Sequence, residues 1–134
     1  MPEELQVGRT ATMERLVTPE LTADRGGNPG AMVFSTPALV SLLEETAIRC
    51  VAPTLSEGQG TVGTHVDMRH LAATPIGIKV TARAEVTEID GRRLVFKVEA
   101  HDEREPVAAG IHERFIITSM EKFLARAAEK AAPP

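Results

Sequence analysis

The segment "STPALVSLLEETAIRCVAP", residues 35–53, decides the fold, because it is the only strong central helix signal in the chain. Thr36 is suited to the N-cap of this helix, and Pro37 is suited to its first helical position. Pro53 is expected to end the helix. At about 100° per residue, its apolar side chains form one continuous arc. The arc consists of Leu39, Val40, Leu43, Ala47, Ile48, Cys50 and Val51. We therefore predict one amphipathic helix packed on a sheet.

Segments with period-two alternation flank this helix and predict five strands. Asp90-Gly91 is a hairpin signal, and the tail after residue 119 predicts a short helix. The order predicts an α+β fold, with one long helix on a curved antiparallel sheet of about five strands. One helix covers only one face of a sheet, so we expect a dimer. The five segments are "VGRTATMERLVT" (7–18), "TVGTHVDMRHL" (61–71), "GIKVTARAEVTEI" (77–89), "RLVFKVEAHD" (93–102) and "VAAGIHERFIIT" (107–118).

Composition indicates the class of protein. With 134 residues, 43% apolar and 25% charged, residues 1–134 are expected to form a single soluble domain. The net charge of −4 argues against nucleic acid as a partner. The lone Cys50 cannot form an internal disulfide. The sequence also shows no secretory leader and no apolar run long enough to span a membrane. Together with the lone cysteine, these features predict a cytoplasmic protein.

Glu44 is the first candidate for a functional residue. It projects at the border of the apolar arc, although its neighbour Glu45 lies on the solvated side. Burying a carboxylate costs free energy unless the group is paired. The commoner interpretation is a side chain that reaches out to water from the edge of the arc. The functional interpretation is a general base or a polar anchor in a cleft.

His70 is the second candidate, in the stretch "HVDMRHLAATPIG" (65–77). Alternation places it at the end of an apolar face formed by Val62, Thr64, Val66 and Met68. His65 falls on the opposite face, so the two histidines do not predict a zinc site, and we expect no metal. A structural histidine is the default interpretation. The alternative is a catalytic residue at the end of a strand.

Nucleophile motifs are scarce. The chain has no G-x-S-x-G elbow and no phosphate-binding loop. Cys50 lies on the apolar arc, where a thiol is usually inert packing. The hydroxyl of Thr36 is explained by capping alone, which is worth about 1 kcal/mol.

The strand–helix–four-strand order is that of hotdog-fold proteins, and the chain resembles the fluoroacetyl-CoA thioesterase-like family of that superfamily. The matching stretches span most of residues 33–117 and include the run H-x-A-A-T-P-x-G from His70 to Gly77. They are "VFST…LVSLLEETAIR", "GTVGTHVDMRHLAATPIGIKVTARAEVTEIDGRRLVFKVEAHD" and "GIHERFII". The resemblance implies an acyl-CoA thioesterase without a cofactor. It would act as a homodimer on short or medium acyl-CoA, giving a carboxylate and free CoA.

The resemblance also implies site residues. Thr36, Glu44 and His70 match the family's active-site positions, and Gly63 and Arg114 match positions on the substrate side. In this hypothesis the thioester carbonyl lies between the helix and the end of the His70 strand, where the Gly63 N–H is a candidate oxyanion donor. His70 and Glu44 position or deprotonate the nucleophile. That nucleophile is either water or a carboxylate that forms a transient anhydride.

Other interpretations stay open. A hotdog hydratase would carry an Asp-x-Asn-x-x-His pattern, which is absent here. A non-catalytic module that binds acyl-CoA or a small molecule is the main alternative. Gly63 also suits a strand bulge, and Arg114 a surface position. Thr36 precedes Glu44 by eight residues, about 12 Å along a helix. The two can border one site only if the chain bends at Pro37 or the ligand spans the gap; which residues come from a second subunit stays open.

The segment "TADRGGNPGAMVF" (22–34) bears on selectivity. In the family's namesake this stretch is longer and carries aromatic residues that gate the pocket, whereas here it holds only Phe34. The sequence therefore predicts weak preference for fluoroacetyl over acetyl thioesters.

Overall fold

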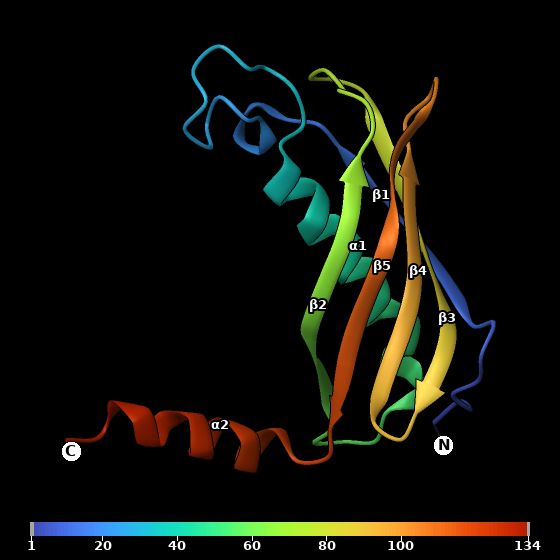
Figure 1. Ribbon diagram of the computed structural model, residues 1–134, viewed down its shortest axis with the longest axis vertical. Coiled ribbons are helices and arrows are strands. Elements are labelled where there is room, and N and C mark those ends of the chain that lie inside the picture. The colour runs from blue at the N-terminus through green and yellow to red at the C-terminus, as the bar shows by residue number, and fades with distance from the viewer. Residues whose placement is uncertain (1, 134) are drawn as a thin grey trace.

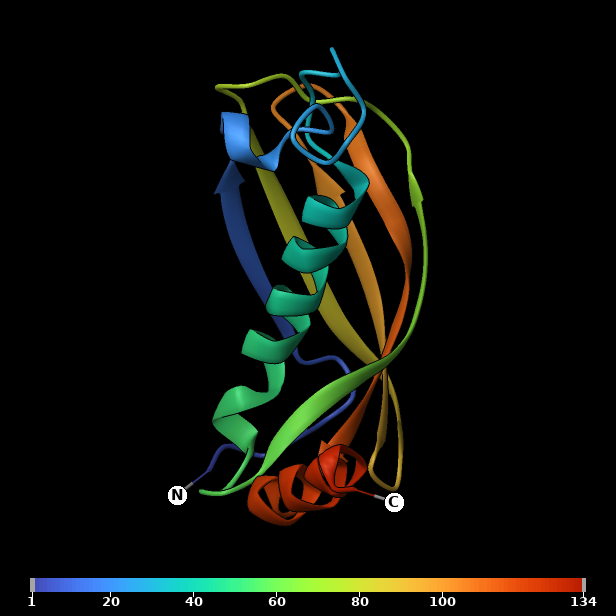
Figure 2. The ribbon, with the colours of Figure 1, turned by 90° about the vertical axis from the view of Figure 1, so that its left-hand side faces the viewer.

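The computed structural model describes residues 2–133 as a curved five-stranded antiparallel sheet with one long helix on its concave face (Figures 1 and 2). The strand order is β1-β3-β4-β5-β2, so β1 and β2 are the edges. This confirms the predicted α+β layout and the short C-terminal helix. The elements are β1 (Thr10–Leu16), η1 (Pro19–Leu21), α1 (Thr36–Val51), η2 (Ala52–Thr54), β2 (Gly60–His70), β3 (Lys79–Asp90), β4 (Arg93–His101), β5 (Pro106–Ile117), α2 (Met120–Ala128) and η3 (Glu129–Ala131).

The start of α1 differs from the prediction by one residue. Ser35, not Thr36, is the N-cap, and its side chain accepts a hydrogen bond from the backbone N–H of Ala38 at 3.1 Å. Thr36 is the first helical residue, followed by Pro37. The capping role predicted for Thr36 is therefore wrong, and its hydroxyl remains available to another group.

The core lies between α1 and the inner faces of β3 and β4. Its apolar side chains alternate along the strands, as expected for a sheet with one covered face. The arc of α1 is rotated relative to the prediction. Leu42 and Thr46 are buried, whereas Ile48 is 42% exposed. The core comprises Leu39, Leu42, Leu43, Ala47, Cys50 and Val51 of α1, Val80, Ala82, Ala84 and Val86 of β3, and Leu94, Phe96, Val98 and Ala100 of β4.

The inner face of β2 is left open by α1. Val66 of β2 is 40% exposed, whereas the inner residues of β3 and β4 are buried. Figure 2 shows α1 lying across the β1 and β3 side of the sheet, while β2 curves away from it. One edge of the molecule therefore has an uncovered strand beside an uncovered helix face.

A bulge in β2 changes which residues share a face. The pairing of β2 with β5 shifts between Gly63 and His65, so Thr64 is an extra residue. Gly63 pairs with Arg114 and therefore joins His70 on the inner face. The predicted alternation, which put Gly63 and His70 on opposite faces, is wrong across this point. The alternative interpretation of Gly63 as part of a bulge is confirmed.

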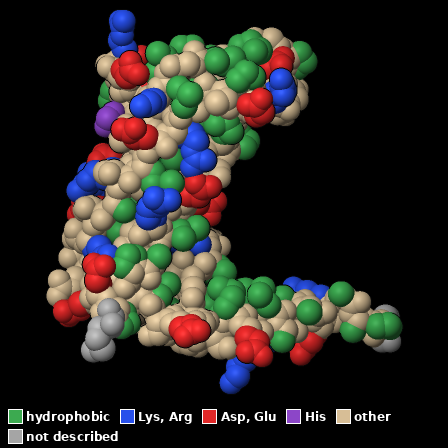
Figure 3. All heavy atoms as spheres, turned by 180° about the vertical axis from the view of Figure 1, so that it is seen from behind, with side chains coloured by type: hydrophobic (Ala, Val, Ile, Leu, Met, Phe, Trp, Pro, Cys, Tyr) green, Lys and Arg blue, Asp and Glu red, His purple; other side chains and the backbone are tan. Residues whose placement is uncertain are grey.

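Two segments project on the side of the free β2 edge. The loop between η1 and α1 lies at one end, and α2 extends at the other (Figure 1). Figure 3, seen from behind, shows the hollow between them. Within residues 2–133, no helix has the length and apolarity needed to cross a membrane.

Candidate active site

Thr36 and His70 meet where α1 begins and β2 ends. The Thr36 hydroxyl and His70 Nδ1 are 2.8 Å apart. The pair lies in a shallow depression of about 350 Å³, which is completed by Val33, Leu71, Ala72 and Ala73. The structure thus joins two of the three residues that sequence analysis proposed as catalytic.

The environment of His70 favours its neutral form. Burial lowers the pKa of His70 from its ordinary value, and the backbone of Ala72 opposes that shift only in part. Nε2 is buried and makes no hydrogen bond to any described residue, so Nδ1 is the nitrogen with a partner. A neutral imidazole beside a hydroxyl is the arrangement of a base and its proton donor.

A second set of polar residues, called here the Glu44 group, consists of Glu44, Thr61, His112 and Arg114. Arg114 Nη1 donates to Glu44 Oε2 at 3.4 Å, and the same guanidinium donates to the Thr61 hydroxyl at 2.8 Å and to the Thr61 carbonyl at 3.0 Å. Arg114 is buried, so its interpretation as a surface residue is wrong. Burial lowers the pKa of the guanidinium, and Glu44 opposes this shift. Glu44 is therefore a carboxylate anchored by a buried cation.

His112 belongs to the same group and was missed by sequence analysis. Its Nδ1 lies 2.8 Å from the His65 carbonyl, which can only accept, so Nδ1 carries the proton. Nε2 is then free to accept from Arg114 Nη1 at 3.1 Å. Burial lowers the pKa of His112, and the adjacent Arg114 charge lowers it further. The available signal was a histidine two residues from an arginine on a strand face that is otherwise small or apolar.

Gly63 makes room for the Glu44 carboxylate. A Cβ at this position would lie 2.7 Å from Glu44 Oε2, 3.2 Å from Arg114 Nη1 and 3.3 Å from His112 Cε1. The first of these distances is shorter than any normal contact, so a side chain would displace the carboxylate. Gly63 is thus required by a close approach rather than by its backbone conformation.

The two groups lie apart within one chain. Thr36 and Glu44 are separated by eight residues, about 12 Å along α1. His70 and Gly63 are separated by seven residues, roughly 20 Å along β2. The structure therefore brings Thr36 to His70, and Glu44 to Gly63 and Arg114, without joining the two sets. In residues 2–133, no group of three or more His, Cys, Asp or Glu side chains is arranged to hold a metal ion.

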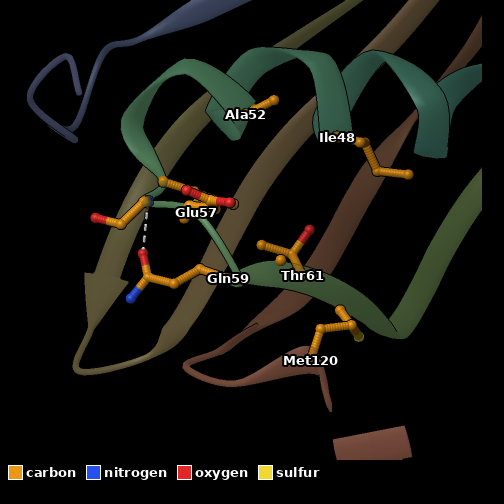
Figure 4. A pocket seen from close by; sticks show the side chains of 10 residues that line it. Ile48, Ala52, Glu57, Gln59, Thr61 and Met120 are labelled. Atoms are coloured by element: carbon orange, nitrogen blue, oxygen red, sulfur yellow. Dashed lines mark hydrogen bonds between the residues drawn. The ribbon is translucent and has the colours of Figure 1, made fainter. Parts of the chain in front are cut away.

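A depression of about 440 Å³ adjoins the second group (Figure 4). Ile48 of α1 and Ala52 of η2 form one wall, and Thr61 and Met120 lie across from them. The turn at residues 55–60 closes the end, where Gln59 Oε1 accepts from the Ser56 N–H at 2.8 Å. Thr61 lines this depression and also accepts a hydrogen bond from Arg114, so it is the residue that the depression and the Glu44 group share.

Comparison with known proteins places these residues in a family. Residues 17–120 match the family described as fluoroacetyl-CoA-specific thioesterase (FlK). The chain is 43% identical over 98 residues to the fluoroacetyl-CoA thioesterase of Streptantibioticus cattleyicolor, a match that covers 73% of this chain and 70% of the relative. The chain belongs to this family. Membership confirms the predicted class, a hydrolase that acts on acyl-CoA thioesters.

Similar solved structures confirm the hotdog fold. The fluoroacetyl-CoA thioesterase FlK superposes with a TM-score of 0.88 at 36% identity, covering 98% of this chain and 100% of that one. A threonine-to-serine mutant of FlK, solved in complex with acetyl-CoA, gives 0.89 at 36% identity, with coverage of 96% and 100%. A hot-dog-like protein from Thermanaerovibrio acidaminovorans gives 0.87 at 26% identity, with coverage of 96% and 94%.

Proposed function

We propose that this thioesterase hydrolyses short or medium acyl-CoA to a carboxylate and free CoA, in two active sites that are each completed by two subunits. The observation that carries this proposal is the separation of the Thr36–His70 pair from the Glu44 group along the same uncovered edge. The buried, unpaired Cys50 suits a reducing cytoplasm, where we place the protein.

The free edge of β2 supports a two-fold dimer. Edge strands present unpaired N–H and C=O groups, and β2 is the longer free edge, with 11 residues against 7 in β1. In an antiparallel pairing of two β2 strands, a two-fold axis between Val66 and Asp67 sets His70 opposite Gly63 of the partner subunit. The Thr36–His70 pair of each subunit then faces the Glu44 group of the other subunit, so the dimer has two such sites.

Such a composite site contains the groups that thioester hydrolysis needs. The neutral His70 imidazole takes a proton, through the Thr36 hydroxyl, from a water that Glu44 of the partner subunit orients. The water oxygen bonds to the acyl carbon, the C–S bond breaks, and the proton returns through Thr36 to the CoA thiolate. Glu44 also stabilises the imidazolium that forms during the reaction, and Arg114 holds the carboxylate in place.

The acyl chain has space beside Glu44. The depression next to Thr61 is walled partly by Ile48, Ala52 and Met120, which suits a few methylene groups rather than a long chain. At the other end, Phe34 is buried in the core and so does not gate a pocket. These features support a preference for short or medium chains and weak recognition of fluorine.

The test is a panel of acyl-CoA esters from two to twelve carbons, assayed for thiol release. We expect turnover of short and medium esters, and its loss in Glu44→Gln. A protein that binds acyl-CoA without releasing thiol from any ester would instead be the non-catalytic module, and the proposal would be wrong.

A further inference from the structure

α2 carries an apolar face that its own chain does not cover. Met120, Phe123, Leu124 and Ala127 recur at helical spacing, and no residue of α2 is buried. Leu124 is 57% exposed. Ser119 caps the helix by accepting from the Lys122 N–H at 3.2 Å. A capped helix of 9 residues is still marginal when isolated in water, so its stability implies a packing partner.

The direction of α2 indicates where that partner lies. α2 starts beside β2, where Met120 lies close to Gly60, and runs out past the free edge (Figures 1 and 2). A helix of 9 residues is about 14 Å long, and neighbouring strands are about 4.8 Å apart. α2 therefore spans the width of roughly three strands. In the proposed dimer, the strands beyond β2 belong to the second subunit.

The surface that α2 would meet there is itself apolar and exposed. Antiparallel pairing brings the His70 end of the partner's β2 to the Gly60 end from which α2 starts. Leu71, which is 52% exposed, lines the same depression as Thr36 and His70. Ile76 adds a further exposed apolar side chain on the same connection. In Figure 3, hydrophobic side chains also gather on the side of the α2 arm that faces the hollow.

We propose that α2 of each subunit docks its apolar face against Leu71 of the partner subunit and covers the partner's Thr36–His70 pair. The inference rests on the proposed dimer and gives the C-terminal helix a place in the active site. Phe123 then supplies, from the second copy, an aromatic cover that residues 22–34 of the same chain do not provide. Covering the pair excludes bulk water and strengthens the hydrogen bond between Thr36 and His70.

Two alanines on opposite sides of α2 provide a matched test in the full-length chain. Ala127→Asp puts a carboxylate on the apolar face, and Ala125→Asp puts the same carboxylate on the polar face of the same helix. We expect Ala127→Asp to raise the dimer dissociation constant and lower kcat/KM, each by about tenfold or more, because the carboxylate is desolvated on docking. Ala125→Asp should stay within about twofold of the parent, since surface changes cost little.

Hydrogen exchange gives a second measurement that reports directly on coverage. The backbone amides of residues 71–74, 76 and 77 should exchange faster in Ala127→Asp than in Ala125→Asp, at protein concentrations where both variants are dimers. If the two variants have equal dissociation constants, equal kcat/KM and equal exchange at 71–77, α2 docks elsewhere and the inference is overturned. A monomeric or inactive parent would instead refute the proposed function, so the two failures are distinguishable.

Discussion

Mixing two inactive variants should restore activity if the active site is shared between subunits. Glu44→Gln breaks one part of each site, and His70→Ala breaks the other. Each variant alone should lose at least about a hundredfold in kcat/KM, the low end for a general acid–base group. In a heterodimer, one site combines His70 from the first chain with Glu44 from the second and is intact, while the other site carries both substitutions.

The expected recovery follows from statistical assembly. Random pairing of equal amounts of the two variants gives half heterodimers, each with one intact site, so about a quarter of all sites are functional. Across mixing ratios, the functional fraction is the product of the two mole fractions and is greatest at equal amounts. The assay is thiol release at saturating acyl-CoA after the mixed chains are unfolded and refolded together, with heterodimers verified by mass spectrometry.

A matched control uses two variants of the same half-site. Thr36→Val mixed with His70→Ala leaves no intact site in any dimer, because both residues come from one chain. We expect no recovery from this pair. If the Glu44→Gln and His70→Ala mixture also stays inactive although heterodimers are present, the three residues act within one chain and the two-fold arrangement is refuted.

Three further predictions concern single features of the site. Gly63→Ala should lower kcat/KM by at least about tenfold in a folded dimer, because its Cβ would lie 2.7 Å from Glu44 Oε2; near-parental kinetics would contradict the close approach. Burial lowers the pKa of His70, so kcat/KM should hold at neutral pH and fall only below the ordinary histidine pKa of 6.5; an acid limb above that value in the pH–rate profile would contradict a buried, neutral base. The ratio of kcat/KM for fluoroacetyl-CoA over acetyl-CoA should stay below about a thousand, because a small difference in an apolar pocket is worth roughly 1–3 kcal/mol; a larger ratio in direct competition would show that discrimination does not need an aromatic gate.

Much of this architecture could be predicted from the sequence because its signals are local. The Pro-flanked apolar arc of α1 and the alternating strands follow from side-chain periodicity alone. Glu44 and His70 were recognisable because each is a polar residue at the border of an apolar face. Both lie on the uncovered side between α1 and β2, where such residues can meet a substrate.

Other features depend on tertiary context. The Thr64 bulge shifts the alternation of β2 by one residue; Gly63 offered a bulge as one alternative, but only the pairing with β5 decides it. His112 seemed unremarkable because the partners that define it, Arg114 and the His65 carbonyl, are set by strand register. The separation of Thr36 from Glu44 was visible along the helix. The explanation that we propose, a dimer formed across the free edge of β2, depends on the strand order, which periodicity does not give.

Ser35 and Thr36 are adjacent residues whose hydroxyls bond different partners. The Ser35 side chain accepts from the backbone N–H of Ala38, which leaves the Thr36 hydroxyl for His70. A Ser or Thr side chain at a helix start is readily drawn to nearby backbone amides. If Ser35 could not bond Ala38, the Thr36 hydroxyl could bond either a free backbone amide at the helix start or His70 Nδ1. The hydrogen bond between Thr36 and His70, through which the proposed proton transfer runs, would then form less often. In the proposed mechanism, Ser35 therefore keeps helix capping separate from the Thr36–His70 pair, so a residue that does not contact this pair would contribute to turnover as well as to stability.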